Sequence, residues 1–173
     1  MKSVKSAIYT ESRARNRPSM YADPVAWAVL DFASTIIEEL GDVERANVGL
    51  LAISDVCSLS TMRLLSDSSK NGKISPLRFA GANPGIIAGL TAIEYKLRGP
   101  SLVLTMSPER AVAVVLPVLK YWIEQNGVAQ VILVAHEKNR DLNDVLRGVI
   151  IKKTEKFEEK TSNNINFVLT GRS

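Results

Sequence analysis

The sequence predicts an α/β protein in which a five-stranded, mainly parallel mixed sheet carries helices on both faces. Short apolar runs of strand length alternate with segments of helical period, an order typical of parallel strands joined by helical crossovers. The 173 residues are 46% hydrophobic and 23% charged. A chain of this length and composition can bury a core without the help of disulfides or metals.

Five segments have the composition of strands. The runs at 47–54, 101–106 and 130–136 are compact and apolar, as expected of strands that are buried on both faces. The segment 4–9 contains aromatic and β-branched residues and predicts a first strand. The segment 166–170 predicts a last strand or an edge strand.

Four segments have helical patterns with recognisable boundaries. Asp23 and Pro24 predict the start of a helix that ends at Gly41, because Asp caps helix N-termini, Pro suits the first turn and Gly suits the position after the last. Pro108 opens a longer helix, which Pro117 is expected to kink. The other two predicted helices cover 55–67 and 86–97, and loops are expected at 10–23 and 68–85.

The rare residue types exclude several classes of site. One cysteine excludes a disulfide framework and a CxxC redox pair, and one cysteine with one histidine excludes a Cys/His zinc site. The sequence contains neither GxxxxGK[ST] nor GxGxxG, the two common phosphate-binding motifs. We therefore expect neither a cofactor nor a metal.

Charge and hydropathy indicate the environment. The 22 Lys and Arg and 18 Asp and Glu are scattered along the chain, whereas nucleic-acid binding requires a concentrated basic surface. No apolar run reaches the ~18 residues of a membrane span. The two N-terminal lysines, Lys2 and Lys5, precede no apolar core of a secretory signal. The sequence predicts a cytoplasmic protein that binds neither nucleic acid nor membrane.

A few residues stand out individually. Cys57 begins a predicted helix, where a nucleophile is conceivable, but a buried structural thiol is the expected role. His136 ends a strand, at the edge where parallel sheets bind ligands, and a surface histidine is the alternative. Arg13, Arg15 and Arg17 could face an acidic partner or simply be solvated. The lysines of residues 152–160 are interleaved with glutamates and predict a solvated segment.

Residues 75–107 carry a family resemblance. Ser75-Pro76 and Phe79 lead a loop, Asn83-Pro84 starts a helix of small residues, and the phrase Leu-Arg-Gly-Pro-Ser at 97–101 leads into a strand. Over about residues 47–136 the chain resembles the N-terminal half of β-ketoacyl synthases, the condensing enzymes of fatty-acid and polyketide synthesis. The resemblance implies half of a thiolase-like fold. Residues 1–173 would form one such domain, with 138–163 as a polar connection.

The resemblance also identifies a nucleophile position. In the family, the strand after Gly-Pro-Ser delivers a cysteine to a helix N-terminus, within the phrase Thr-Ala-Cys-Ala-Ser-Gly. A helix N-terminus lowers the pKa of a thiol and offers N–H groups to an oxyanion. Here residues 105–110 read Thr-Met-Ser-Pro-Glu-Arg, which places Ser107 at the cysteine position. Ser107 is thus a vestigial nucleophile or a helix N-cap.

Further changes oppose condensation by this chain. Pro108 removes one N–H, Glu109 adds a negative charge near any developing anion, and the family's two catalytic histidines belong to a C-terminal half that this sequence does not match. We expect no condensing activity from the chain alone.

The resemblance finally implies an interface. In synthase dimers the strand matching 101–106 pairs across a two-fold axis, and the loop around Phe79 lies near the partner subunit. These residues could equally be core. The expected interface residues are Phe79, Ser101, Leu102, Val103, Leu104, Thr105 and Met106.

Three functions are consistent with these observations. The first is a non-catalytic subunit, similar to a chain length factor, that pairs with a complete ketosynthase; an acidic acyl carrier protein is a further candidate partner. The second is an acyl-thioester hydrolase or transferase that uses Ser107. The third is a homodimeric ligand-binding protein.

Overall fold

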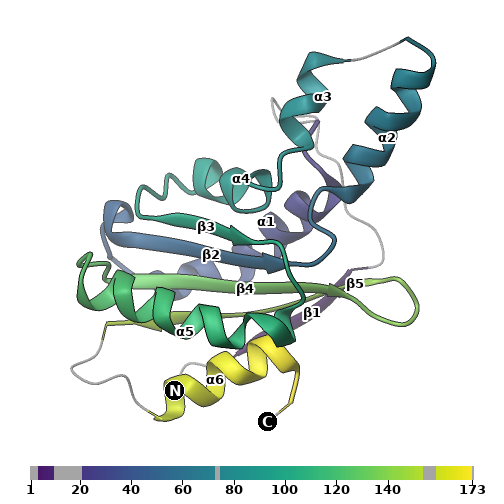
Figure 1. Cartoon of the computed structure of the whole chain (residues 1–173). Coiled ribbons are helices and arrows are strands. Elements are labelled where there is room, and N and C mark those ends of the chain that lie inside the picture. Colours follow the sequence, from purple (N-terminus) through teal and green to yellow (C-terminus); the bar gives the residue numbers. More distant parts are fainter. Residues whose placement is uncertain (1–3, 10–20, 73–74, 154–158, 173) are drawn as a thin grey trace.

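The computed structural model describes residues 4–9, 21–72, 75–153 and 159–172, and its centre is a five-stranded mixed sheet (Figure 1). The strand order is β1-β5-β4-β2-β3. Strand β2 pairs in parallel with β3 and β4, whereas β5 is antiparallel to both of its neighbours. The strands are β1 (Lys5–Tyr9), β2 (Val48–Ser54), β3 (Ser101–Leu104), β4 (Gln130–Lys138) and β5 (Asp144–Lys152).

The helices cover both faces of the sheet, as the alternating pattern predicts. Helices α1 and α4 lie on one face and α5 and α6 on the other, while α2 and α3 project beyond the carboxyl end of β2 (Figure 1). None of the described helices is both long and apolar enough to cross a membrane. The helices are α1 (Pro24–Ile36), η1 (Ile37–Leu40), η2 (Arg45–Asn47), α2 (Leu59–Lys70), α3 (Pro76–Gly81), α4 (Ile86–Glu94), α5 (Pro108–Glu124) and α6 (Glu159–Thr170).

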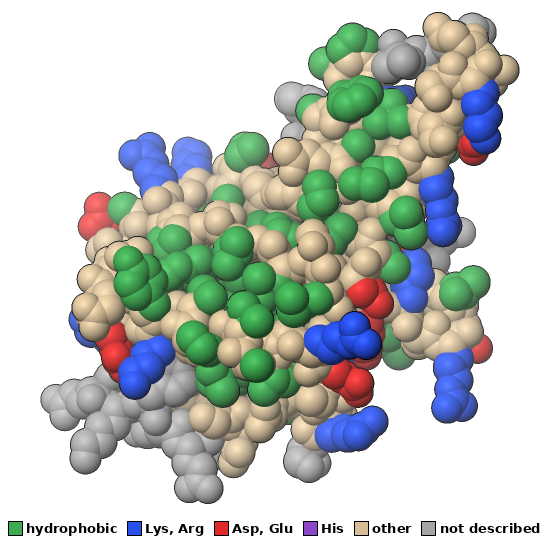
Figure 2. Space-filling view, viewed as in Figure 1, with side chains coloured by type: hydrophobic (Ala, Val, Ile, Leu, Met, Phe, Trp, Pro, Cys, Tyr) green, Lys and Arg blue, Asp and Glu red, His purple; other side chains and the backbone are tan. Residues whose placement is uncertain are grey.

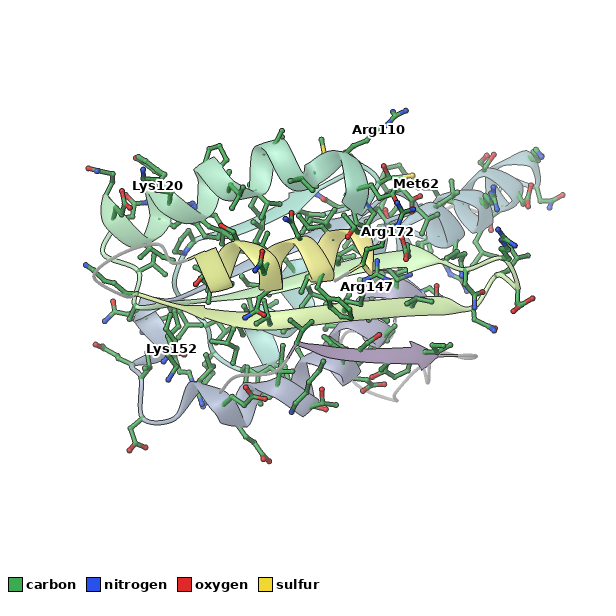
Figure 3. The ribbon with its side chains drawn as sticks, turned by 90° about the horizontal axis from the view of Figure 1, so that it is seen from below. Met62, Arg110, Lys120, Arg147, Lys152 and Arg172 are labelled. Carbon is green, nitrogen blue, oxygen red and sulfur yellow. The ribbon has the colours of Figure 1, made fainter. Side chains whose placement is uncertain are left out.

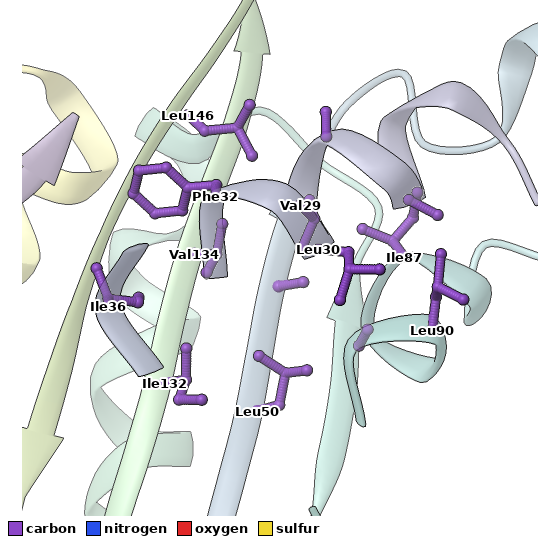
Figure 4. Close-up of a cluster of buried hydrophobic side chains, with 14 of the residues drawn as sticks. Val29, Leu30, Phe32, Ile36, Leu50, Ile87, Leu90, Ile132, Val134 and Leu146 are labelled. Atoms are coloured by element: carbon purple, nitrogen blue, oxygen red, sulfur yellow. The ribbon is translucent and has the colours of Figure 1, made fainter. Parts of the chain in front are cut away.

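Strand β2, at the centre of the sheet, is a continuous apolar run because both of its faces are covered by helices. All seven of its residues are buried. Successive side chains of a strand point to opposite faces, so Leu50 joins the cluster beneath α1 and α4, while Leu51 joins the cluster beneath α5 and α6. Figure 4 shows the first cluster, in which Phe32 and Ile36 of α1 face Val134 and other strand residues.

The carboxylate of Asp23 binds the first turns of both α1 and α2. The side chain of Asp23, fully buried, accepts a hydrogen bond from the backbone N–H of Val25 at 3.0 Å, as the predicted N-cap should. Its second oxygen accepts from the N–H of Thr61 at 2.8 Å, in the first turn of α2. Asp23 therefore ties the starts of α1 and α2 together.

The strand predicted at 166–170 is wrong, because these residues belong to α6. Ile165, Val168 and Leu169 are fully buried against the α5 side of the sheet. Their i, i+3, i+4 spacing is that of one helix face, which a five-residue window beginning at 166 does not reveal.

The fifth strand lies instead within the segment predicted to be a polar connection. Residues 144–152 form β5, an antiparallel hairpin partner of β4. The Asn139 side chain closes the turn by accepting from the backbone N–H groups of Asp141 and Asn143 at 3.0 and 2.9 Å. The prediction missed β5 because polar residues at both ends of the segment 138–163 outnumber the buried apolar residues between them.

Two local boundaries also differ from the prediction. The predicted loop 77–84 contains helix α3, which begins at Pro76. The helix predicted at 55–67 begins at Leu59, after a turn in which Cys57 has φ 42°. Arg13, Arg15 and Arg17 lie outside the described residues, as do positions 154–158; Lys152 and Lys153 are exposed, as predicted.

We predict that Gly148→Ala destabilises the fold by about 2–3 kcal/mol. A Cβ at Gly148 would lie 2.6 Å from Cε1 of Phe32 and 2.9 Å from the carbonyl oxygen of Leu133, so the buried Phe32 ring and the neighbouring strand would have to shift. Urea unfolding measures the change. Gly89→Ala is the matched control: its Cβ would meet nothing within 4 Å, and alanine favours the helix. Equal stability of the two variants would contradict the prediction.

Candidate functional site

Strand β3 forms one edge of the sheet. Within the part of the chain that the structure describes it pairs with β2 alone, so its other side presents unpaired N–H and C=O groups. Leu102, Val103 and Leu104 are only half-buried, and Ser101 and Thr105 are exposed. The sheet thus ends in an apolar strand.

The helices beside β3 extend this apolar surface. Ile93 of α4 is 71% exposed, and Tyr121 of α5 is 56% exposed. Leu102, Leu104 and Met106 are only partly buried against the α5 side of the sheet, so much of their surface remains open. Figure 2 shows hydrophobic side chains gathered into one area over β3 and α5. We call Ile93 and residues 102–106 the β3 patch.

Phe79 lies apart from this patch. Helices α2 and α3, which we call the arm, pack on each other beyond the sheet (Figure 1). Phe79 is 63% exposed on the arm, beside a hollow of about 560 Å³. That hollow is lined by Met62, Leu65, Phe79, Ala82, Asn83 and Pro84. The structure therefore divides the predicted interface residues between the sheet edge and the arm.

Ser107 stands between β3 and α5 with extended backbone angles (φ −63°, ψ 140°), as the N-cap of α5. Its side chain makes no capping hydrogen bond. A catalytic Ser107 would need a base, and the sequence offers Glu109 and His136. Glu109 lies 3.6 Å from Arg172. His136 hydrogen-bonds to two other side chains, Ser54 and Asp144. That Ser107 is a former nucleophile position stays a prediction.

His136 instead belongs to a buried chain of hydrogen bonds that the sequence did not suggest. Nδ1 of His136 lies 2.8 Å from Oγ of Ser54, and Nε2 lies 2.9 Å from Oδ1 of Asp144. Lys138 donates to the same carboxylate oxygen at 2.7 Å. Ser54 ends β2, His136 lies on β4, and Asp144 begins β5, so these hydrogen bonds link three neighbouring strands.

The residue types Ser, His and Asp could form a nucleophilic triad, but the geometry is structural. Ser54 and His136 are at most 1% exposed. Oγ of Ser54 accepts the N–H of Cys57 at 2.9 Å and also pairs with Nδ1 of His136, while Nε2 of His136 donates to the Asp144 carboxylate. Because Ser54 is fully buried, no substrate can reach its hydroxyl. The hydrogen bonds therefore brace these strand ends.

Cys57 is likewise structural, as expected. Cys57 is 6% exposed, and its thiol lies 3.0 Å from the carbonyl oxygen of Ser54, to which it donates. Burial raises the pKa of the Cys57 thiol, and the nearby carboxylates of Asp55 and Asp23 add to the rise against the hydrogen bond with Ser54. A protonated, buried thiol is a poor nucleophile.

The pKa of Asp144 predicts a pH dependence of stability. Burial pushes this pKa up, but the hydrogen bonds and charges of His136 and Lys138 outweigh burial and hold it below its ordinary value. A carboxyl group with a lowered pKa in the folded state stabilises the fold above its unfolded pKa of ~3.9. That stabilisation is lost as the pH falls through the folded-state pKa.

We therefore expect Asp144→Asn to lower the free energy of unfolding by about 1–2 kcal/mol at pH 7. Below the folded-state pKa of Asp144 the substitution should change it hardly at all. Urea unfolding between pH 7 and pH 2 measures the difference. Asp67→Asn is the matched control, since Asp67 pairs with Lys70 at 2.9 Å but both side chains are 72% exposed. Such a pair contributes under about 0.5 kcal/mol. A pH-independent loss in Asp144→Asn would contradict the assignment.

Comparison with known proteins identifies the fold. No family model and no curated sequence matches the chain. Among solved structures, the ishigamide ketosynthase/chain length factor aligns with a TM-score of 0.66 at 12% identity, over 87% of this chain and 49% of that chain. A ketosynthase in complex with its chain length factor from Xenorhabdus doucetiae aligns with a TM-score of 0.63 at 12% identity, over 82% and 63%.

Ketosynthase twelve of the bacillaene polyketide synthase of Bacillus amyloliquefaciens also aligns, with a TM-score of 0.60 at 11% identity, over 84% of this chain and 31% of that chain. The chain spans from about a third to under two thirds of the length of these structures. At such identities the likeness defines the fold. The mixed five-stranded sheet with helices on both faces is thus the ketosynthase-like architecture that the sequence resemblance predicted, corresponding to one half of a thiolase-like fold.

Proposed function

We propose that this chain is a non-catalytic, ketosynthase-like subunit that pairs with a complete ketosynthase through the β3 edge. The observation that carries the proposal is the unpaired apolar strand at that edge. An edge strand of this composition readily pairs with another strand, because its free N–H and C=O groups and its apolar side chains are both satisfied by a neighbour.

Similarity to known complexes supports a ketosynthase as the neighbour. Two of the similar structures combine a ketosynthase with a chain length factor. The family resemblance implies that the equivalent of β3 pairs across the two-fold axis of such dimers. A partner with its own apolar edge strand would continue the sheet across the β3 patch, and Phe79 on the arm would reach further over the partner.

The surroundings of Ser107 support a non-catalytic role. A serine nucleophile needs a base within about 3 Å. The only histidine is committed to Ser54 and Asp144, and Glu109 faces Arg172. Ser107 therefore serves as the N-cap of α5 in this proposal. An acyl carrier protein remains a predicted further partner.

Charge at the β3 edge should weaken pairing. Thr105→Asp adds a carboxylate at an exposed position, so the variant should fold; Leu104→Asp adds one at a half-buried position. We expect both to weaken binding of the complete ketosynthase from the same gene neighbourhood by at least about tenfold, since an interface carboxylate would lose its water unpaired. Light scattering and titration calorimetry of the mixture measure this.

Ile8→Asp is the matched control for those variants. Ile8 is 63% exposed on β1, the opposite edge of the same sheet, and should tolerate the charge without loss of binding. A wild-type chain that ignores the ketosynthase, or edge variants that bind as well as Ile8→Asp does, would overturn the proposal.

Ser107→Ala tests the absence of chemistry. We expect the variant to bind the ketosynthase normally and to leave the condensing activity of the complex unchanged. Intact-mass measurement of the wild-type chain after incubation with acyl-loaded carrier protein should show no added acyl group. An acyl adduct that Ser107→Ala removes would favour the hydrolase or transferase alternative instead.

A further inference from the structure

The outer face of α5 has an unusual pattern for a solvent-facing helix surface. The buried side of this helix comprises residues such as Ala111, Val115 and Leu119, which face the sheet. The opposite side is exposed along its whole length; its middle is apolar except for Lys120, and a charged residue stands at each end. We call it the α5 stripe, and it consists of Arg110, Ala113, Val114, Pro117, Lys120, Tyr121 and Glu124.

The apolar middle is uncovered in the described part of the molecule. Tyr121 is 56% exposed and Val114 is 37% exposed. Figure 2 shows hydrophobic side chains continuing over this area, and Figure 3 shows Arg110 pointing away from the sheet. An exposed aromatic ring beside valine and proline is typical of the centre of a protein interface.

The charged ends have no partner among the described residues. Neither Arg110 nor Glu124 forms an ion pair or a side-chain hydrogen bond there, whereas the neighbouring Glu109 is paired with Arg172. The two unpaired groups carry opposite charges. Arg110 and Glu124 can pair with each other only between two molecules, because ~21 Å of helix separates them. Lys120 lies one turn from Glu124, but the two form no ion pair among the described residues.

The spacing of the stripe is symmetric about its centre. Arg110 and Glu124 each lie seven residues from Pro117, so the three occupy one line along the helix. If two copies of α5 cross antiparallel on a two-fold axis at Pro117, Arg110 of each copy meets Glu124 of the other. The bulky Tyr121 then lies against the small Ala113, the aliphatic part of Lys120 lies against Val114, and the short side chain of Pro117 allows close approach.

We propose that the α5 stripe is a homotypic interface that binds a second copy of this chain. The charge pattern identifies the occupant, because a surface with a cation at one end and an anion at the other is complementary to its own antiparallel copy. The stripe and the β3 edge are formed by different elements of the fold, so the homotypic contact does not depend on ketosynthase pairing.

Charge reversal tests the contact. We expect R110E and E124R each to raise the dissociation constant of the homodimer by about tenfold or more, since every substitution places two like-charged pairs in a two-fold interface. The double variant R110E/E124R restores opposite charges and should return the constant to within about threefold of wild type. Sedimentation velocity over a concentration series, with the chain alone, measures all four proteins.

Lys152→Glu is the matched control, because Lys152 is an exposed cation at the end of β5 and its reversal should leave the homodimer intact. A wild-type chain that stays monomeric up to about 1 mM overturns the proposal. It is equally overturned if the double variant shows no rescue, or if Thr105→Asp alone abolishes the homodimer, which would assign that contact to β3. Ketosynthase binding by R110E separates this result from the proposal for the β3 edge.

Discussion

The parallel pairing of β2 with β4 is the contact on which the rest of the structure depends. These two strands are buried on both faces, and every helix that covers the sheet packs on side chains that they supply. A two-sided sheet leaves no polar position in its centre, so the composition of β2 follows directly. Within β2 and β4, polar side chains lie only toward the strand ends, and at their carboxyl ends Ser54 and His136 satisfy each other.

Much of this architecture could be predicted from local pattern. The apolar runs at 47–54, 101–106 and 130–136 are strands, and Asp23 caps its helix, because burial and capping leave signals within a few residues. The error at 166–170 has the opposite cause. Phe, Val and Leu suit a strand and a helix alike, and only the inclusion of Ile165 reveals a helical face.

The candidate sites show the limit of that local information. The edge position of β3 followed from the family resemblance and agrees with the observed strand order. Ser54 and His136, by contrast, are 82 positions apart in the chain, and no spacing rule connects them. The symmetric spacing of the α5 stripe is present in the sequence, but it can be recognised as a surface pattern only once the other side of α5 is known to face the sheet.

The way in which the arm is attached has a mechanical consequence. The N–H of Thr61 donates to Asp23 and ties the arm to the body at its base. Beside this contact, Ser58 donates to the carbonyl of Ala82 and joins the two ends of the arm. Helix α2 has 12 residues and so extends ~18 Å from that pivot. A rotation of about 10° at the base would move the tip by about 3 Å. A small change in the hydrogen bonds that Asp23 accepts from α1 and α2 would thus produce a larger displacement at the far end of the arm. Asp23 is the pivot of that displacement.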